Sequence, residues 1–206
     1  MLINVLDPND QQHTDSTRLI ALGVLNSAFE ESGSHITDFP SLAVLITDPG
    51  CKFLFQLARS DNPAVLNASL RAISTVFDTM RKHLKLQQEL FLAFTMDRLA
   101  PPILPGTIGR KGGIMASSVA GSPRSSVPSS PALGPQSEEK AVDTGLSTPS
   151  RVLVVPAKGE TRDSLLETLA QIARHPSFMV DLYMNYDCDV NCENMFERLM
   201  DFCTKV

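Results

Sequence analysis

The sequence lacks several features that whole classes of protein require. It has no Trp, and aromatic residues make up only 6% of its 206 residues. It has no block of Lys and Arg, and its formal net charge is −5, which argues against nucleic acid as a partner. No apolar run approaches the roughly 20 residues of a transmembrane helix, and Met1–Leu6 is too short for a secretory signal. We therefore expect a soluble, cytoplasmic protein whose contact with membranes is peripheral.

Cysteine is also scarce, and its spacing does not indicate a metal site. The four cysteines, Cys51, Cys188, Cys192 and Cys203, lie in apolar or helical stretches, which predicts buried, reduced thiols. Cys188, Cys192 and Cys203 are candidate zinc ligands together with His175. No tight CxxC pair is present, however, so the spacing does not favour a zinc site. We expect no metal and no cofactor.

Apolar residues at helical spacing are abundant, and they are separated by short polar or Pro-containing turns. Asp or Asn followed by Pro marks several of the expected helix starts, because the N–H that Pro lacks has no partner there. The pattern predicts an all-α fold of stacked helical hairpins, an α-solenoid of the armadillo or HEAT type; a compact helical bundle is the alternative. The helices are expected at about 15–31, 40–46, 49–57, 63–80, 84–99, 161–174, 178–185 and from 192 on. The helix at 63–80 has a continuous apolar stripe to Met80, and Leu90 and Val180 are among the apolar residues expected on the buried faces of their helices.

The composition changes abruptly between residues 106 and 150. Of these 45 residues, 22 are Gly, Ser or Pro and none is aromatic, so the segment cannot bury enough apolar surface to become ordered. We expect a disordered insertion at 106–150 between two helical parts, 1–105 and 151–206, that pack as one unit. The run 151–156 is expected to be extended where the chain re-enters the fold. Three Ser or Thr residues of the insertion precede Pro and are candidate sites for proline-directed kinases: Ser122, Ser130 and Thr148.

One polar turn between the last two expected helices contains candidate ligands. Asp187, Asp189 and Asn191 match the first three ligand positions of a calcium-binding EF-hand loop. Cys192, however, stands where the sharp turn needs Gly, and Arg198 stands where the bidentate Glu should be. The calcium interpretation therefore fails.

Catalysis is not indicated either. Two carboxylates beside Cys188 disfavour its thiolate, and the glycines at 109–113 lie in the insertion rather than between a strand and a helix. The turn instead suits helix capping, with Asp187 and Asp189 accepting backbone N–H groups near the last helix and Asn191 as its cap. Tyr186 has a ring to bury. The outer face of the turn could also contact a partner.

Three stretches of the chain are similar to a known protein family. Residues 182–189, followed by residues 194–199, closely resemble the HUS box of the large Golgi-type guanine-nucleotide exchange factors for Arf GTPases. Residues 13–23 and 84–92 resemble the start and middle of the same HUS domain, and they indicate the brefeldin-A-resistance branch of the early Golgi. We call residues 185–189 the box; its members are Asn185, Tyr186, Asp187, Cys188 and Asp189.

The resemblance implies a regulatory module without catalytic activity. Its implied partners are the dimerisation and cyclophilin-binding (DCB) domain of the same or a second exchange-factor chain, and Arf and Rab small GTPases. It further implies autoregulation, Golgi membrane recruitment and an armadillo-like solenoid. The long insertion is not part of the family pattern. The alternative function is a generic armadillo-like scaffold that binds peptides and has no link to GTPases.

Overall fold

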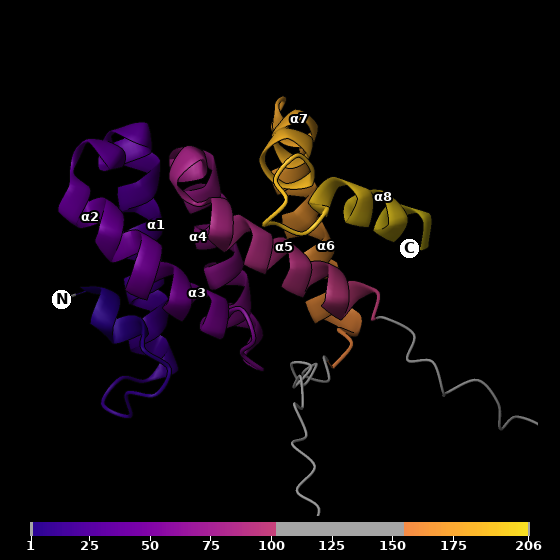
Figure 1. The fold of residues 1–206 in the computed structure, drawn as a ribbon. Coiled ribbons are helices and arrows are strands. Elements are labelled where there is room, and N and C mark those ends of the chain that lie inside the picture. Colours follow the sequence, from indigo (N-terminus) through magenta and orange to yellow (C-terminus); the bar gives the residue numbers. More distant parts are fainter. Residues whose placement is uncertain (1, 102–154, 206) are drawn as a thin grey trace, which may run out of the picture. The chain divides into compact units, whose positions relative to one another are not determined.

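The computed structural model describes residues 2–101 and 155–205, and every regular element in these ranges is helical (Figure 1). The all-α prediction is therefore confirmed. The insertion at 106–150, with Ser122, Ser130 and Thr148, lies outside the described residues.

The elements are η1 (Leu2–Leu6), α1 (Asp15–Ser32), η2 (Gly33–Asp38), α2 (Pro40–Leu45), η3 (Ile46–Gly50), α3 (Cys51–Leu57), α4 (Pro63–Met80), η4 (Arg81–His83), α5 (Lys85–Leu99), α6 (Gly159–Ala173), α7 (Phe178–Leu182), η5 (Tyr183–Asp187) and α8 (Met195–Lys205).

The helix ends follow from local chemistry. The side chain of Thr14 accepts the N–H of Thr17 at the start of α1, and Asn62 accepts the N–H of Ala64 at the start of α4. Gly33 ends α1 with a φ of 52°, a conformation that residues with a Cβ rarely adopt. These boundaries match those expected from the sequence.

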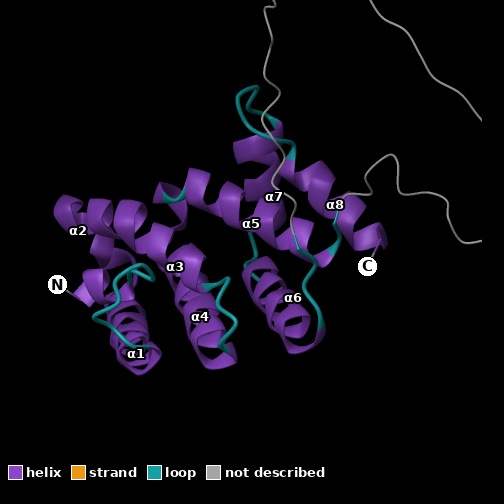
Figure 2. Ribbon diagram, turned by 90° about the horizontal axis from the view of Figure 1, so that it is seen from below, coloured by secondary structure: helices purple, strands orange, loops and turns teal. Residues whose placement is uncertain are grey.

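The longest helices lie side by side. In Figure 2, α1, α4 and α6 form one row, and α2, α3 and α5 lie in a second layer above it. Helix α4 packs against both α1 and α6, while α3 contacts α4 and α5 contacts α6. Helix α4 is therefore the centre of the packing.

The core contains residues from both sides of the insertion. All apolar positions of the predicted α4 stripe are buried, and so are Leu165 of α6 and Phe178 of α7. Phe55, Phe77 and Phe91 form an aromatic cluster, in which the Phe91 ring centroid lies 5.6 Å from each of the other two. The described residues before and after the insertion belong to one compact unit. The exact limits of the insertion fall among residues that the structure does not describe and stay a prediction.

The connection back into the fold is visible from residue 155. Residues 155–158 have no regular secondary structure, and the N–H of Ala157 donates to the carbonyl of Arg98 at 2.8 Å. The expected extended run at 151–156 lies mostly outside the described residues. Within the described ranges, no helix is long and apolar enough to cross a membrane.

Two predicted helix boundaries were wrong, because π-helical turns join neighbouring helices. Asp48 and Pro49 do not start a helix; they lie inside η3, a π turn that links α2 to α3 without a break. Helix α7 likewise continues through the π turn η5 to Asp187, beyond the expected end at Asn185. A π turn adds one residue to the helical repeat, which a search at 3.6-residue spacing does not detect.

Other predictions were wrong about individual side chains. Leu90 and Val180 were expected on buried faces, but they are 55% and 63% exposed. Cys188 and Cys203 are exposed and Cys192 is half-buried, so only Cys51 is a buried thiol. Burial raises the pKa of Cys51 to about 12.

Candidate functional site

The box forms the π turn η5 and the bend that follows it, and Tyr186 anchors it. The ring of Tyr186 is only 2% exposed, and its hydroxyl donates to the carbonyl of Lys85 in the first turn of α5 at 2.8 Å. Burial raises the pKa of Tyr186, and the negative charge of Glu89 adds to the effect. The tyrosine therefore remains a neutral hydrogen-bond donor.

Asp187 caps the last helix from a distance. Its two carboxylate oxygens accept the N–H groups of Phe196 at 2.8 Å and of Glu197 at 3.1 Å, both in the first turn of α8. These N–H groups have no partner within the helix, and a negative charge at a helix N-terminus is favourable. The prediction that at least one box aspartate accepts backbone N–H groups near this helix is confirmed. Asn191, however, lies four residues before α8 and is not its cap.

Asp189 connects the box to α5 by charge. Its carboxylate lies 2.6 Å from the Lys85 ammonium and also accepts the N–H of Asn191 at 3.0 Å. The hydrogen bond from Lys85, followed by that from Asn191, lowers the pKa of Asp189 from 3.8 to about 2. Because this pKa is depressed in the folded state, the ion pair contributes its stability above about pH 4 and loses it as the pH falls through about 2.

The remaining box residues face outward. Asn185 and Cys188 are exposed, and the backbone N–H of Cys188 closes the π turn by donating to the carbonyl of Tyr183 at 3.0 Å. The structure thus brings Tyr186, Asp187 and Asp189 together and leaves the other two side chains apart.

Sequence reasoning missed the partners of the box on α5. One side of this helix carries four residues at four-residue spacing, 85, 89, 93 and 97. Each of them contacts a residue between Asp189 and Arg198. Glu89 accepts the N–H of Glu193 at 3.1 Å, and Asp97 lies 2.7 Å from the Arg198 guanidinium. Arg198 also donates to the carbonyl of Ala93 at 3.5 Å and pairs with Glu193. The four-residue spacing was available from the sequence, but the partners lie more than a hundred residues away.

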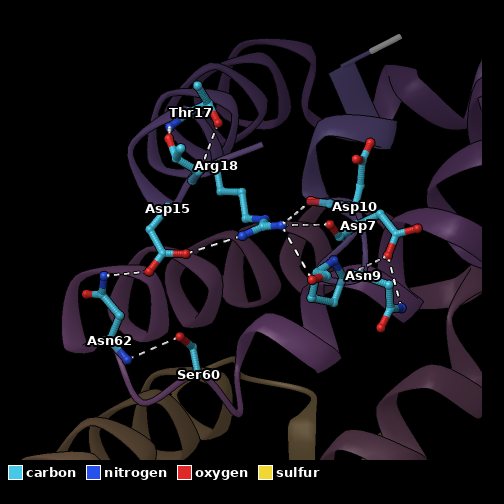
Figure 3. A network of polar contacts seen from close by, with 10 residues as sticks. Asp7, Asn9, Asp10, Asp15, Thr17, Arg18, Ser60 and Asn62 are labelled. Atoms are coloured by element: carbon cyan, nitrogen blue, oxygen red, sulfur yellow. Dashed lines mark hydrogen bonds and ion pairs between the residues drawn. The ribbon is translucent and has the colours of Figure 1, made fainter. Parts of the chain in front are cut away.

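The stretch at 13–23 is organised around one arginine (Figure 3). Arg18 donates to the carbonyls of Asp7, Pro8 and Asp10 at 3.1, 3.4 and 2.8 Å, and it lies 3.3 Å from the Asp15 carboxylate. Asp15 in turn accepts a hydrogen bond from Asn62 at the start of α4. Arg18 thus ties the loop before α1 to the α1–α4 pair.

The described residues offer little for metal binding or hydrolysis. They contain no group of three or more His, Cys, Asp or Glu side chains placed to hold a metal ion. Ser177 lies 3.0 Å from Nδ1 of His175 and donates to Asp181 at 2.7 Å. In a catalytic triad the histidine bridges the serine and the acid, whereas here the serine bridges the other two. This cluster therefore cannot relay a proton as a triad does.

Comparison with known proteins identifies the class of domain. The chain matches the family described as Mon2/Sec7/BIG1-like, HUS domain, over residues 1–105 and 147–195. The chain therefore belongs to this family of HUS domains. Residues 106–146, which lie within the segment predicted to be an insertion, and residues 196–206 are left unmatched.

Similar curated proteins include exchange factors for Arf. The chain is 36% identical to an uncharacterized protein of Schizosaccharomyces pombe, with 100% of the chain and 14% of that protein covered. It is 26% identical to the Golgi-specific brefeldin A-resistance guanine nucleotide exchange factor 1 homolog of Caenorhabditis elegans, with 96% of the chain and 8% of that protein covered. It is 28% identical to the ARF guanine-nucleotide exchange factor GNOM of Arabidopsis thaliana, with 91% of the chain and 9% of that protein covered. The prediction of a HUS domain of the brefeldin-A-resistance type is confirmed, and the chain spans about a tenth of the length of these relatives.

Proposed function

We propose that this chain is a regulatory and interaction module of a large Arf guanine-nucleotide exchange factor and is not itself catalytic. In this proposal it packs against the DCB domain of the same or a second exchange-factor chain. It thereby supports autoregulation and recruitment of the exchange factor, with Arf and Rab GTPases, to the cytoplasmic face of Golgi membranes. The observation that carries the proposal is the family match over both helical parts of the chain. The relatives named as guanine-nucleotide exchange factors, one of them for ARF, argue against a generic peptide-binding scaffold.

The helix packing supports an armadillo-like α-solenoid. Helix α4 lies between α1 and α6 in one row, and the helices that follow α1 and α4 in the chain lie in the second layer (Figure 2). In a solenoid each unit contacts only its neighbours, and a terminal unit needs a polar outer face to remain exposed to water. The two ends of the row are therefore the places where a further helical domain could pack.

The α1 end of the row has an apolar outer face. Asn26 and Glu30 bond to Thr75 and Arg71 of α4, which fixes the side of α1 that faces its neighbour. A different side of α1 carries a stripe of apolar residues at four-residue spacing, Ile20, Val24 and Ala28; Ile20 is 69% exposed and Val24 is 51% exposed. This stripe is unpartnered among the described residues.

The stripe leads into an apolar pocket of about 330 Å³. Ala28 belongs to both, and the other lining residues include Leu2, Ile3, Phe29, Leu42 and Ile46. A pocket of this size accommodates one or two large apolar side chains, and its walls carry no charge that would need a partner. We therefore place the DCB contact on the α1 stripe and this pocket.

Charge on the α1 stripe tests this placement. We expect the double substitution Ile20→Glu with Val24→Glu to weaken binding of the isolated DCB domain at least tenfold, about 1.4 kcal/mol, because it places two charges in an apolar interface. Titration calorimetry measures the affinity, and circular dichroism checks that the melting temperature is kept. Leu90→Glu is the matched control, since Leu90 is equally exposed but lies on α5. Unchanged binding in the double variant, or an equal loss in the control, would contradict the placement.

A further inference from the structure

A second exposed apolar surface lies where η5 meets α8. The rings of Tyr183 and Phe196 pack edge to face, with centroids 6.0 Å apart. Tyr183 is 52% exposed and its neighbour Met184 is 60% exposed, while Phe196 is half-buried. Met200, one turn after Phe196, is also half-buried and extends the surface along α8. We call these four residues the shoulder.

The fold does not need the outer side chains of the shoulder. The inward positions of η5 and α8 are occupied by Tyr186, Met195 and Leu199, which are buried. The backbone of Phe196 is held by Asp187, and that bond does not depend on the side chain of residue 183 or 184. Aromatic and Met side chains are enriched at protein interfaces, and Met-rich surfaces adapt to helical partners.

The edge of the shoulder is acidic. Glu197 is exposed, and its carboxylate accepts a hydrogen bond only from Asn194 among the described residues. Among the other acids nearby, Glu193 lies next to Arg198 and Asp201 lies next to Lys205, while the Asp187 carboxylate accepts two backbone N–H groups of α8. The chain as a whole carries a net charge of −5. Glu197 is therefore the carboxylate at this edge that is available to a cation from outside.

From this combination we infer that the shoulder is a docking surface for an amphipathic helical segment of a partner protein, one that carries Lys or Arg about one turn from a large aliphatic side chain. Phe196 and Met200 lie four residues apart and form a ridge of the kind that packs beside another helix. The aliphatic side chain would contact Tyr183 and Met184, and the cation would pair with Glu197. An anionic membrane is disfavoured, because the acidic edge repels it. This inference goes beyond the proposed function and concerns a surface separate from the α1 stripe.

Selection of helical peptides tests the inference. A displayed library of amphipathic helices is selected on the whole chain, after depletion on a Tyr183→Ala, Met184→Ala variant. We expect the enriched peptides to carry Lys or Arg three or four residues from Leu, Met or Phe. Glu197→Lys should weaken their binding at least tenfold, and peptides with Glu in place of the cation should regain binding to that variant. The inference would be overturned if no peptide bound the chain better than it bound the Tyr183→Ala, Met184→Ala variant. It would also be overturned if the enriched peptides lacked a cation.

Two controls make this selection specific. The Ile20→Glu, Val24→Glu variant should bind the selected peptides normally. The peptide test of the shoulder is therefore independent of whether the DCB domain binds at the α1 stripe. The Glu197→Lys variant should still fold, because the backbone N–H of residue 197 still reaches Asp187, and the reversed charge in the first turn of α8 should lower the melting temperature only slightly. If both variants lose the peptides equally, the peptides do not bind at the shoulder, and the inference is wrong.

Discussion

Replacing Tyr186 by Ala should lower the free energy of unfolding by about 3–5 kcal/mol, as is typical for removal of a buried aromatic ring. The ring is almost completely buried between η5 and α5, and its hydroxyl donates to the carbonyl of Lys85. The loss therefore combines a cavity with the loss of the hydrogen bond to the Lys85 carbonyl. Urea unfolding followed by circular dichroism measures the change.

Tyr186→Phe separates the two contributions. It keeps the ring and removes only the hydroxyl, so a loss of about 0.5–1.5 kcal/mol is expected. Tyr183→Ala is the matched control, because Tyr183 lies in the same π turn but is half exposed. A Tyr186→Ala variant that is no less stable than Tyr183→Ala would show that the box is not a structural anchor.

Replacing Arg18 by Met should cost about 2–3 kcal/mol, in the range for hydrogen bonds to a charged group. The change keeps most of the aliphatic stem and removes the guanidinium, which donates to three backbone carbonyls of the loop before α1 (Figure 3). The side chain is only 11% exposed, so water replaces these bonds poorly. Thermal and urea unfolding both report the loss.

Arg71→Met is the control for Arg18. Arg71 pairs with Glu30 across the α1–α4 contact at 3.0 Å, but its side chain is 69% exposed. Exposed ion pairs contribute little, so a change within about 0.5 kcal/mol is expected. Equal losses at the two positions would contradict the role given to the Arg18 network.

The sequence predicted the helices best where a capping residue and an apolar stripe agree. Helix α4 is the clearest example, with Asn62 and Pro63 at its start and a continuous buried stripe to Met80. The predictions failed where the helical repeat is irregular, as at Pro49, since an added residue shifts the faces without breaking the helix. They also failed at Leu90, because apolar residues on three sides of α5 leave its buried face ambiguous.

The box was predicted in part. A capping role could be expected from the residue types, and Asp187 has it. The partner Lys85 and the nearby contact of Glu89 with Glu193 could not be expected, because a single sequence does not show which distant residues meet in the fold. The same limit made Asn191 look like the helix cap, since the true cap reaches α8 from nine residues before Phe196.

We propose that the box supports partner binding by holding the module together, not by contacting the DCB domain. The most direct test is to measure melting temperature and DCB affinity together for the Tyr186→Ala and Asp187→Ala variants. Loss of the Asp187 cap alone should cost about 0.5–2 kcal/mol. Both variants are expected to melt at a lower temperature and to lose DCB binding in proportion to the unfolded fraction. Normal melting together with lost binding in both variants would contradict this proposal.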